Sequence, residues 1–512
     1  MVPQNSSPSY PLNKTQNTHP VVFLGAALLA LGFVTLSLVF KESALEAFMV
    51  VKANVVSQAG WFFLTATNLF LLVCLFLIFS KRGAIRLGGG EATPSYSFTT
   101  WLAMLFSAGM GIGLVFWSVA EPIFHYGSPS LSDIEAGTKA AARMAQTTTF
   151  FHWGLHAWGI YALMGLSLAF CAYNRGLPLT IRSTLEPILG KYTDGPVGNC
   201  VDILASVATL FGVATSLGFG VQQVNAGLAH VLGTPENHWI QMLLIAAITL
   251  LATISVVSGL DRGVRRLSEA NMALAGLLMV YVMFAGPTWE QISGLWVNTL
   301  DYFRKLPALS VWFGSDSPDK KWQESWTIFY WAWWISWSPF VGMFIARISR
   351  GRTLREFTIG VLIVPTSLTF LWLSVFGNAA LAQALSGNIE FVQLVNDNQA
   401  KSLFALLDVM PLSRIMSLIG LIVIILFFVT SSDSGSLVID IITSGGHSNP
   451  PIWQRVFWAV SEGVVAAVLL LVGGDQALEA LQTASVVTGL PFACILVFIA
   501  FSFLKQTRAS FD

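Results

Sequence analysis

Trp331-Ala332-Trp333-Trp334-Ile335-Ser336-Trp337-Ser338-Pro339-Phe340 places four tryptophans within seven positions and then a proline, inside a stretch long enough to cross a membrane. A helix that faces only lipid favours leucine, isoleucine, valine and phenylalanine, whereas tryptophan prefers the headgroup level and proline removes a backbone hydrogen bond. The segment therefore predicts an aromatic surface inside the protein. Ring faces of this kind suit a quaternary ammonium, a cation that donates no hydrogen bonds.

The composition of the chain indicates an integral membrane protein. Of its 512 residues 54% are hydrophobic and 11% are charged, whereas about 25% are charged in soluble proteins. The apolar runs are long and uncharged, which predicts helices and not a barrel. The 27 basic and 27 acidic residues cancel, so no nucleic-acid partner is expected. The four cysteines lack metal-type spacing and no set of nucleophile and base is visible, so we expect no cofactor and no enzymatic activity.

Apolar runs and helix breakers predict an all-α fold with about twelve transmembrane helices. The expected spans are 20–40, 55–80, 98–126, 139–173, 197–232, 237–258, 267–287, 324–346, 354–385, 412–443, 452–473 and 487–506. The first run lacks a charged lead-in and a cleavage site, so we expect a retained span. Basic residues cluster in alternate loops, and the positive-inside rule places these loops and both termini in the cytoplasm. Examples are Lys81, Arg82, Arg86, Arg175, Arg182, Lys191, Arg347, Arg350, Arg352 and Arg355.

Two of these spans contain helix breakers. The third holds the glycines of 109–113, and the eighth holds Ser336 to Pro339. Glycine costs about 1 kcal/mol and proline about 3 kcal/mol in a helix interior, so breaks at membrane depth are tolerated where the backbone lines a cavity. Matched breaks in two halves are typical of transporters built from repeated units around a central site. Close packing of helices is the alternative explanation for the glycines.

The fourth span adds a second group of aromatic residues. Trp153, Trp158 and Tyr161 are separated by five and three positions, which places them on one face of a continuous helix. This spacing predicts a second wall of an aromatic site. An aromatic belt at the membrane surface is the alternative.

Five motifs at these positions resemble the betaine/choline/carnitine transporter family. They are Gly109-Met110-Gly111-Ile112-Gly113-Leu114, Glu121-Pro122, the segment 152–161, the run 326–352, and Thr430-Ser431-Ser432-Asp433-Ser434. The resemblance implies the amino-acid/neurotransmitter-transporter-like fold, with two inverted five-helix repeats preceded by two extra helices, commonly as a homotrimer. It also implies a bacterial inner membrane as the location, with the lipid bilayer as surroundings.

The fold implied by this resemblance divides the chain into six parts. They are a cytoplasmic tail (1–19), two leading helices (20–97), the first repeat (98–287), an amphipathic interfacial helix and loop (288–323), the second repeat (324–506) and a short cytoplasmic tail (507–512). The stretch 288–323 is too polar to span, and its aromatic residues alternate with charges.

Carried over by motif, the site for an onium substrate is an aromatic box. Its expected members are Trp153, Trp158, Tyr161, Trp333, Trp334 and Trp337, with Met110 and Gly113 beside them. A desolvated cation–π contact contributes about 2 kcal/mol, so several ring faces supply much of the roughly 8 kcal/mol of a micromolar site.

The family's sodium ligands are also matched by motif. One site would use backbone groups of Ser107, Met110 and Phe427 and the hydroxyls of Thr430 and Ser431. Hydroxyls bonded back to their own helix are the alternative explanation for the last two. A second site would use Thr209 and Phe340, but its other hydroxyl position is Val213, so the number of sodium ions stays open. Proton linkage through His152 or His156 is a further alternative.

The charge of the substrate is predicted from residue 113. Choline-specific relatives tend to carry aspartate at this position of the motif, whereas this chain has Gly113. A zwitterion carries its own carboxylate, so we expect a sodium-coupled symporter of glycine betaine, dimethylsulfoniopropionate, carnitine or ectoine-like solutes. An ion-independent exchanger of carnitine or betaine type, and a choline uptake transporter, are the alternatives.

Overall fold

The computed structural model describes residues 18–109, 111–130, 133–258, 261–314, 317–447 and 449–509. Almost all of this part of the chain is helical, and its strand-like pairing is one bridge between Arg86 and Thr353. The helices of the first half are α1 (Pro20–Val39), α2 (Lys41–Phe79), α3 (Phe98–Gly109), α4 (Ile112–Gly127), α5 (Lys139–Trp153), α6 (Leu155–Arg175), α7 (Glu186–Leu189), α8 (Pro196–Leu232), α9 (His238–Ser258) and α10 (Asp261–Ala285).

The second half begins with α11 (Thr288–Val311) and α12 (Ser317–Ser325). It continues with α13 (Thr327–Ile348), α14 (Leu354–Leu385), α15 (Ile389–Asp397), α16 (Ser402–Asp408), α17 (Ser413–Thr443), α18 (Ile452–Gly473) and α19 (Ala477–Ala509). Short 3-10 turns lie at η1 (Lys81–Ala84), η2 (Arg182–Leu185), η3 (Gly190–Asp194), η4 (Gln399–Lys401) and η5 (Gly474–Gln476).

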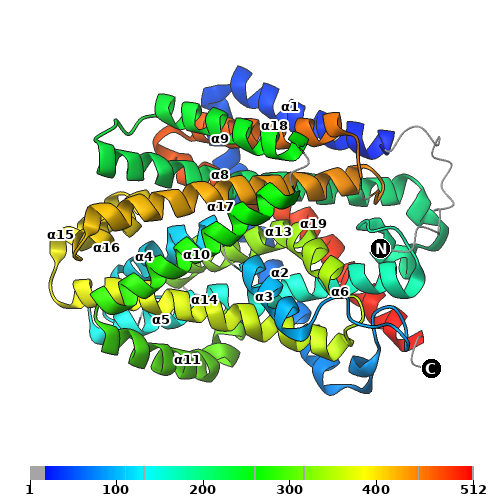
Figure 1. Cartoon of the computed structure of the whole chain (residues 1–512), viewed down its shortest axis with the longest axis horizontal. Coiled ribbons are helices and arrows are strands. Elements are labelled where there is room, and N and C mark those ends of the chain that lie inside the picture. The colour runs from blue at the N-terminus through cyan, green and yellow to red at the C-terminus, as the bar shows by residue number, and fades with distance from the viewer. Residues whose placement is uncertain are drawn as a thin grey trace.

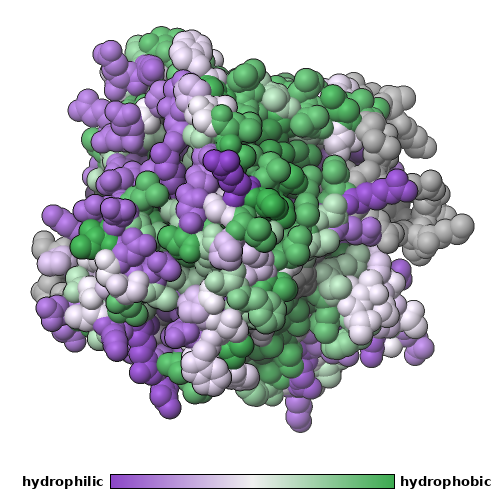
Figure 2. Space-filling view, turned by 60° about the vertical axis from the view of Figure 1, so that its left-hand side comes forward, coloured by the Kyte–Doolittle hydropathy of each residue, from purple (hydrophilic) through white to green (hydrophobic). Residues whose placement is uncertain are grey.

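The long helices lie side by side, roughly along one direction (Figure 1). Figure 2 shows a broad band of hydrophobic residues across that direction, with hydrophilic residues on either side of it. Nine helical segments of the described chain are long and apolar enough to cross a membrane, and the last of them joins α18 to α19. The two expected spans outside this set are the broken α3–α4 and the tryptophan-rich α13. The protein is an all-helical membrane protein, and its helices agree with the expected twelve spans.

Equivalent helices of the two expected repeats pack against each other. The contacts join α6 to α14, α8 to α17, and α9 to α18. In the same way α4 contacts α14, while α13 contacts α6. Reciprocal pairs of this kind are what two units related by a pseudo-twofold axis produce.

The break in the third span is confirmed. Helix α3 ends at Gly109 and α4 starts at Ile112, with Gly111 as an extended N-cap residue that provides no side-chain cap. The first N–H groups of α4 are therefore free of a side-chain cap at the point where the chain is interrupted.

The expected break in the eighth span is wrong, because α13 runs through Pro339 as a continuous helix. Proline lacks the N–H that would bond to the carbonyl four residues earlier, which is that of Ile335. The Ser338 hydroxyl donates to this Ile335 oxygen at 2.8 Å. The serine therefore replaces the missing donor, and the helix continues.

The fourth span is interrupted instead, at Gly154 between α5 and α6. The backbone N–H of Leu155 donates to the Tyr302 hydroxyl at 3.0 Å, which satisfies a group that the break exposes. Trp153 consequently ends one helix, while Trp158 and Tyr161 lie on the next. The expectation that all three share a face of one continuous helix is wrong.

The stretch 288–323 contains two helices, α11 and α12, and α11 is amphipathic in an unusual sense. Its aromatic side chains Trp289 and Trp296 are exposed, whereas Asn298 and Asp301 are buried against the rest of the protein. Asp301 pairs there with Arg143 of α5. The apolar face of α11 thus points away from the molecule, as an interfacial helix requires.

Both ends of the described chain lie on one side of the molecule (Figure 1). The His19 backbone N–H, just before α1, donates to the carbonyl of Thr443 at the end of α17, and Arg82 donates to Leu504 in α19. On the same side Arg86 donates to Gly351 at 2.6 Å. Basic residues that predicted the cytoplasmic side therefore cluster together, while the orientation itself stays a prediction.

A close approach of α6 and α13 depends on glycine and can be tested. A Cβ on Gly342 would lie 2.7 Å from Met164 Cγ and 3.0 Å from the backbone nitrogen of Gly165. We expect Gly342→Leu to destabilise the protein by at least the 1–3 kcal/mol or so typical of overpacking. Thermal unfolding in detergent measures the effect. Gly276→Leu in α10 is the matched control, because a Cβ there meets no atom within 4 Å; equal unfolding temperatures in the two variants would contradict the packing argument.

Candidate functional site

The aromatic residues expected from the sequence surround one cavity between α4, α5, α6, α8, α13 and α14. The cavity has a volume of about 50 Å³. Its lining residues are Gly111, Gly113, Leu114, Trp153, Ala157, Trp158, Tyr161, Ser216, Trp333, Trp334, Trp337, Val341 and Thr369. All six predicted aromatic residues and Gly113 are among them, while Met110 lies outside the described residues.

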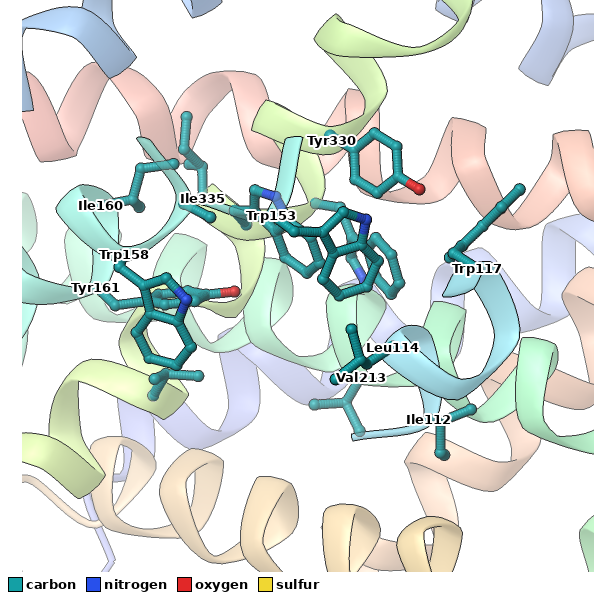
Figure 3. Close-up of a cluster of buried hydrophobic side chains, with 14 of the residues drawn as sticks. Ile112, Leu114, Trp117, Trp153, Trp158, Ile160, Tyr161, Val213, Tyr330 and Ile335 are labelled. Carbon is teal, nitrogen blue, oxygen red and sulfur yellow. The ribbon is translucent and has the colours of Figure 1, made fainter. Parts of the chain in front are cut away.

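Ring contacts connect the two aromatic walls. Trp333 and Trp334 are stacked, with centroids 4.6 Å apart and planes 16° from parallel. Trp153 meets Trp334 edge to face at 4.8 Å, and Trp158 meets Tyr161 at 5.3 Å. Figure 3 shows Trp158 beside Tyr161, with Trp153 in the same cluster. The cavity therefore has ring faces and edges in several orientations around a small space.

Hydrogen bonds within the protein hold three of these indoles. Trp334 Nε1 donates to the backbone oxygen of His152 at 2.9 Å. Trp337 Nε1 donates to the backbone oxygen of Gly212 at 2.8 Å, and Trp153 Nε1 donates to Glu121 Oε2 at 2.8 Å. The polar atoms of these rings are thus bonded to the protein, and what the rings offer to a ligand is their π surface.

Gly113 lies directly against the aromatic wall. A Cβ at this position would be 2.5 Å from Trp333 Cη2 and 3.3 Å from Trp153 Cη2. The first distance is shorter than side chains tolerate, so any larger residue would displace the Trp333 ring. The position that predicted the charge of the substrate is therefore also a steric boundary of the cavity.

A second cavity, of about 170 Å³, adjoins the first and shares Trp337 and Val341 with it. It lies between α3, α10, α13 and α17. Its lining residues are Ser107, Ser268, Asn271, Met272, Trp337, Phe340, Val341, Phe344, Phe427, Thr430, Ser431 and Ser434. The described residues of the predicted first sodium site, namely Ser107, Phe427, Thr430 and Ser431, thus come together here.

The oxygen atoms at this cavity are the type that sodium binds. The Thr430 hydroxyl donates to the Leu426 oxygen at 2.9 Å, as the back-bonding alternative predicted. A hydroxyl that donates its proton still has lone pairs on its oxygen, so the bond is compatible with a cation ligand. Hydroxyls from three helices supply oxygen atoms of the kind that a hard cation prefers.

The two residues of the second expected sodium site do not line a common cavity among those described above. Phe340 lines the second cavity, whereas Thr209 is not among the described residues that line it. The Thr209 hydroxyl donates to the Ala205 oxygen at 2.8 Å. Val213 is fully buried, and a Cβ on Gly435 would meet both its Cγ2 at 2.9 Å and Glu462 Oε1 at 3.0 Å. Side chains therefore fill the space beside Val213.

Three polar contributions were missed by the sequence analysis. Ser216 and Thr369 line the aromatic cavity, where isolated hydroxyls in apolar helices gave no signal. Asn271 lines the second cavity; with its amide oriented so that both groups are satisfied, it donates to the Val423 oxygen at 3.2 Å and accepts from the Phe427 nitrogen at 3.3 Å. The amide thereby ties α10 to the backbone of a predicted sodium ligand.

The histidines of the fourth span have hydrogen-bond partners. His156 Nε2 lies 2.9 Å from Asn68 Oδ1, and His152 lies 2.7 Å from Glu121 Oε1 and 3.0 Å from the Thr327 hydroxyl. Both rings are buried. These contacts fit a structural role for the two residues, in which each ring ties together neighbouring helices.

Fold and cavities together define a multi-pass helical membrane protein with a central aromatic cavity beside a hydroxyl-lined one. The sequence model of the betaine/carnitine/choline family of transporters matches residues 21–511. The chain therefore belongs to that transporter family.

Curated relatives cover nearly the whole chain. A glycine betaine/proline/choline transporter of Vibrio parahaemolyticus is 47% identical over 95% of this chain and 90% of its own length. Glycine betaine transporter 1 of the same organism is 48% identical over 96% and 94%. The glycine betaine transporter of Bacillus subtilis is 44% identical over 89% and 88%. Among solved structures, a manganese transporter of Eremococcus coleocola matches 81% of each chain at 13% identity, with a TM-score of 0.44.

Gly113 provides a direct test of the cavity. We expect Gly113→Ala to weaken substrate binding at least about tenfold, equivalent to about 1.4 kcal/mol, because its methyl group would displace the Trp333 ring. Tryptophan fluorescence titration of purified protein measures the dissociation constant. Gly276→Ala in α10 is the control, since a Cβ there meets no atom within 4 Å and Gly276 lines neither cavity of the described chain. Equal losses in both variants would mean that the ring contact at Gly113 is not responsible.

Proposed function

We propose that the chain is a sodium-coupled symporter that takes up zwitterionic onium solutes, with glycine betaine as the first candidate. The observation that carries the proposal is the aromatic cavity next to a hydroxyl-lined one, with Trp337 and Val341 common to both. A shared wall lets occupation of one cavity change the geometry of the other, which coupling of substrate and ion requires. The names of the relatives agree with the substrate class.

The aromatic cavity selects the head of the substrate. A methylated ammonium or sulfonium has no N–H or S–H groups, so it loses little when water is replaced by ring faces. A lysine-like ammonium has three N–H donors, and the indole N–H groups of Trp334 and Trp337 cannot accept from them, so it would depend on the few hydroxyls that line the cavity. The cavity therefore favours methylated over primary ammonium groups.

The broken third span offers a site for the carboxylate of a zwitterion. Gly111 and Gly113 line the aromatic cavity, and α4 starts between them without a side-chain cap. The free N–H groups and the dipole at a helix N-terminus favour an anion. We propose that the carboxylate of glycine betaine binds here while its trimethylammonium group contacts the rings.

Sodium supplies the driving force in this proposal. One charge that crosses the membrane potential contributes about 2.3 kcal/mol per 100 mV. Ser107, Phe427, Thr430 and Ser431 are the proposed ligands of one ion, and Val213 argues against a second ion at Thr209. The cytoplasmic placement of both termini and a homotrimeric assembly belong to the same proposal, on the strength of the family resemblance.

Uptake by reconstituted protein tests the function. We expect labelled glycine betaine to accumulate in proteoliposomes when sodium is imposed on the outside, and much less when potassium replaces sodium. Dimethylsulfoniopropionate, carnitine and choline are the competing substrates. Uptake that ignores sodium but requires substrate inside the liposome would identify the exchanger alternative, and a strong preference for choline would identify the choline transporter.

Loss of an aromatic ring from the cavity should lower the affinity for substrate more than it lowers the stability of the fold. We expect Trp334→Leu and Trp337→Leu each to weaken betaine binding by about tenfold or more, because a desolvated cation–π contact contributes about 2 kcal/mol. Trp372→Leu removes a buried tryptophan that lines neither cavity and controls for loss of folded protein. Unchanged dissociation constants in both Trp334→Leu and Trp337→Leu would exclude the aromatic cavity as the substrate site.

The sodium ligands call for a separate measurement. We expect Thr430→Val to raise the sodium concentration for half-maximal uptake about tenfold or more, since the methyl group cannot bind a cation. Thr253→Val is the matched control, because the Thr253 hydroxyl makes the same bond to its own helix, to the Thr249 oxygen at 2.8 Å, and lines neither cavity. An equal shift in the two variants would assign the effect to helix stability.

A further inference from the structure

Glu121 in α4 is a fully buried carboxylate at the centre of a hydrogen-bond network. Its Oε2 atom accepts from Trp153 Nε1 at 2.8 Å and from the Tyr330 hydroxyl at 2.5 Å. Its Oε1 atom lies 2.7 Å from His152 Nδ1 and 3.3 Å from His125 Nε2. Four donors on two oxygens match the acceptor capacity of an ionised carboxylate.

Both histidines of this network contact the Glu121 Oε1 atom. One N–H on each imidazole satisfies Glu121 Oε1, and the other nitrogen of His152 lies 3.0 Å from the Thr327 hydroxyl. His125 Nδ1 is buried and has no hydrogen-bond partner among the described residues. The negative charge of the network is that of the Glu121 carboxylate. Among the described residues, the ion pairs of Glu121 are with these two histidines and with no lysine or arginine.

This charge lies one indole ring away from the aromatic cavity. Trp153 binds the carboxylate through its nitrogen and lines the cavity with its ring. Tyr330, the other donor to Glu121 Oε2, lies 5.7 Å from the Trp334 ring, centroid to centroid. A hydrogen bond to an anion shifts electron density into the donor's ring, and the carboxylate adds a direct Coulomb attraction that falls only as the inverse of distance.

The two kinds of onium solute respond differently to such a charge. The Glu121 carboxylate attracts the cationic head of a zwitterion and repels the zwitterion's own carboxylate. The two electrostatic energies therefore oppose each other. A solute with net charge +1, such as a quaternary ammonium alcohol, has only the attractive term. Gly113 supplies no charge to the cavity, and Glu121 stands close enough to supply one from behind Trp153.

We propose that Glu121 is a specificity-determining residue, a counter-charge behind the aromatic wall that lets the cavity bind net-cationic quaternary ammonium solutes as well as zwitterions. It acts through Trp153 and Tyr330 as a positioning residue and does not touch the substrate. The inference rests on the proposed function, namely that the aromatic cavity binds onium heads.

The test is the ratio of choline to glycine betaine affinity in Glu121→Gln. Binding of each solute to purified full-length protein is measured by tryptophan fluorescence. A chelator is present to keep trace metal ions away, because the Glu121, His125 and His152 ligand atoms lie within 4.8 Å of one another. We expect choline affinity to fall at least about tenfold relative to glycine betaine, equivalent to about 1.4 kcal/mol. Glu121→Asp keeps the charge and should keep most of the wild-type ratio.

Two matched variants of His125 test the role of Glu121 if Glu121→Gln does not fold. His125 is four residues from Glu121 on the same helix. His125→Lys places a cation beside the carboxylate and should lower choline affinity selectively, whereas His125→Gln keeps a neutral donor and should leave the ratio unchanged.

The outcomes separate this inference from the function itself. An unchanged ratio in Glu121→Gln, or in His125→Lys where the first variant fails to fold, overturns the role of Glu121, because a purely structural network would weaken both solutes alike. Failure of the wild-type protein to bind either solute contradicts the proposed function instead.

Discussion

The constraint on which the rest of this structure depends is that backbone N–H and C=O groups inside a bilayer need partners within the protein. The chain meets it in three ways. Ser338 bonds the carbonyl that Pro339 leaves free, so α13 stays intact. Tyr302 accepts from Leu155 at the break between α5 and α6. At Gly111 the backbone opens onto the aromatic cavity. Backbone groups that lack a partner in their own helix are therefore bonded by a side chain or lie at a cavity.

The need to bond buried polar groups also applies at the aromatic cavity. Each of three indole nitrogens is bonded to the protein: Trp334 to a backbone oxygen of α5, Trp337 to one of α8, and Trp153 to the carboxylate of Glu121. The first two bonds connect α13 to the first half of the chain, the third connects α5 to α4, and all three fix the rings before a ligand arrives. Preorganised rings avoid the entropy that ordering them on binding would cost. The bonds that stabilise the fold thus also shape the surface that a cation meets.

The sequence predicted much of the fold and of the site because hydropathy and composition are strong signals for membrane helices. It was less successful at the breaks, for a physical reason. Pro339 is a helix breaker by propensity. The Ser338 hydroxyl compensates by donating to the Ile335 oxygen. A prediction from the propensity of proline alone does not include this hydrogen bond. Gly154 interrupts a helix only because the hydroxyl of Tyr302, far away in the chain, receives the exposed N–H. The break at Gly154 could not be predicted from the sequence, because it depends on this tertiary contact.

By itself the sequence determined the all-helical membrane fold, the family, and six aromatic residues that meet around one cavity, because helix length, hydropathy and motifs are properties of neighbouring residues. Tertiary structure alone decided which helices break, that the aromatic and hydroxyl-lined cavities share Trp337, and that Glu121 carries a charge behind Trp153. Those features depend on hydrogen bonds and contacts between residues far apart in the chain. A buried carboxylate takes its role from the donors that surround it, and Tyr330 reaches Glu121 across 209 positions of sequence.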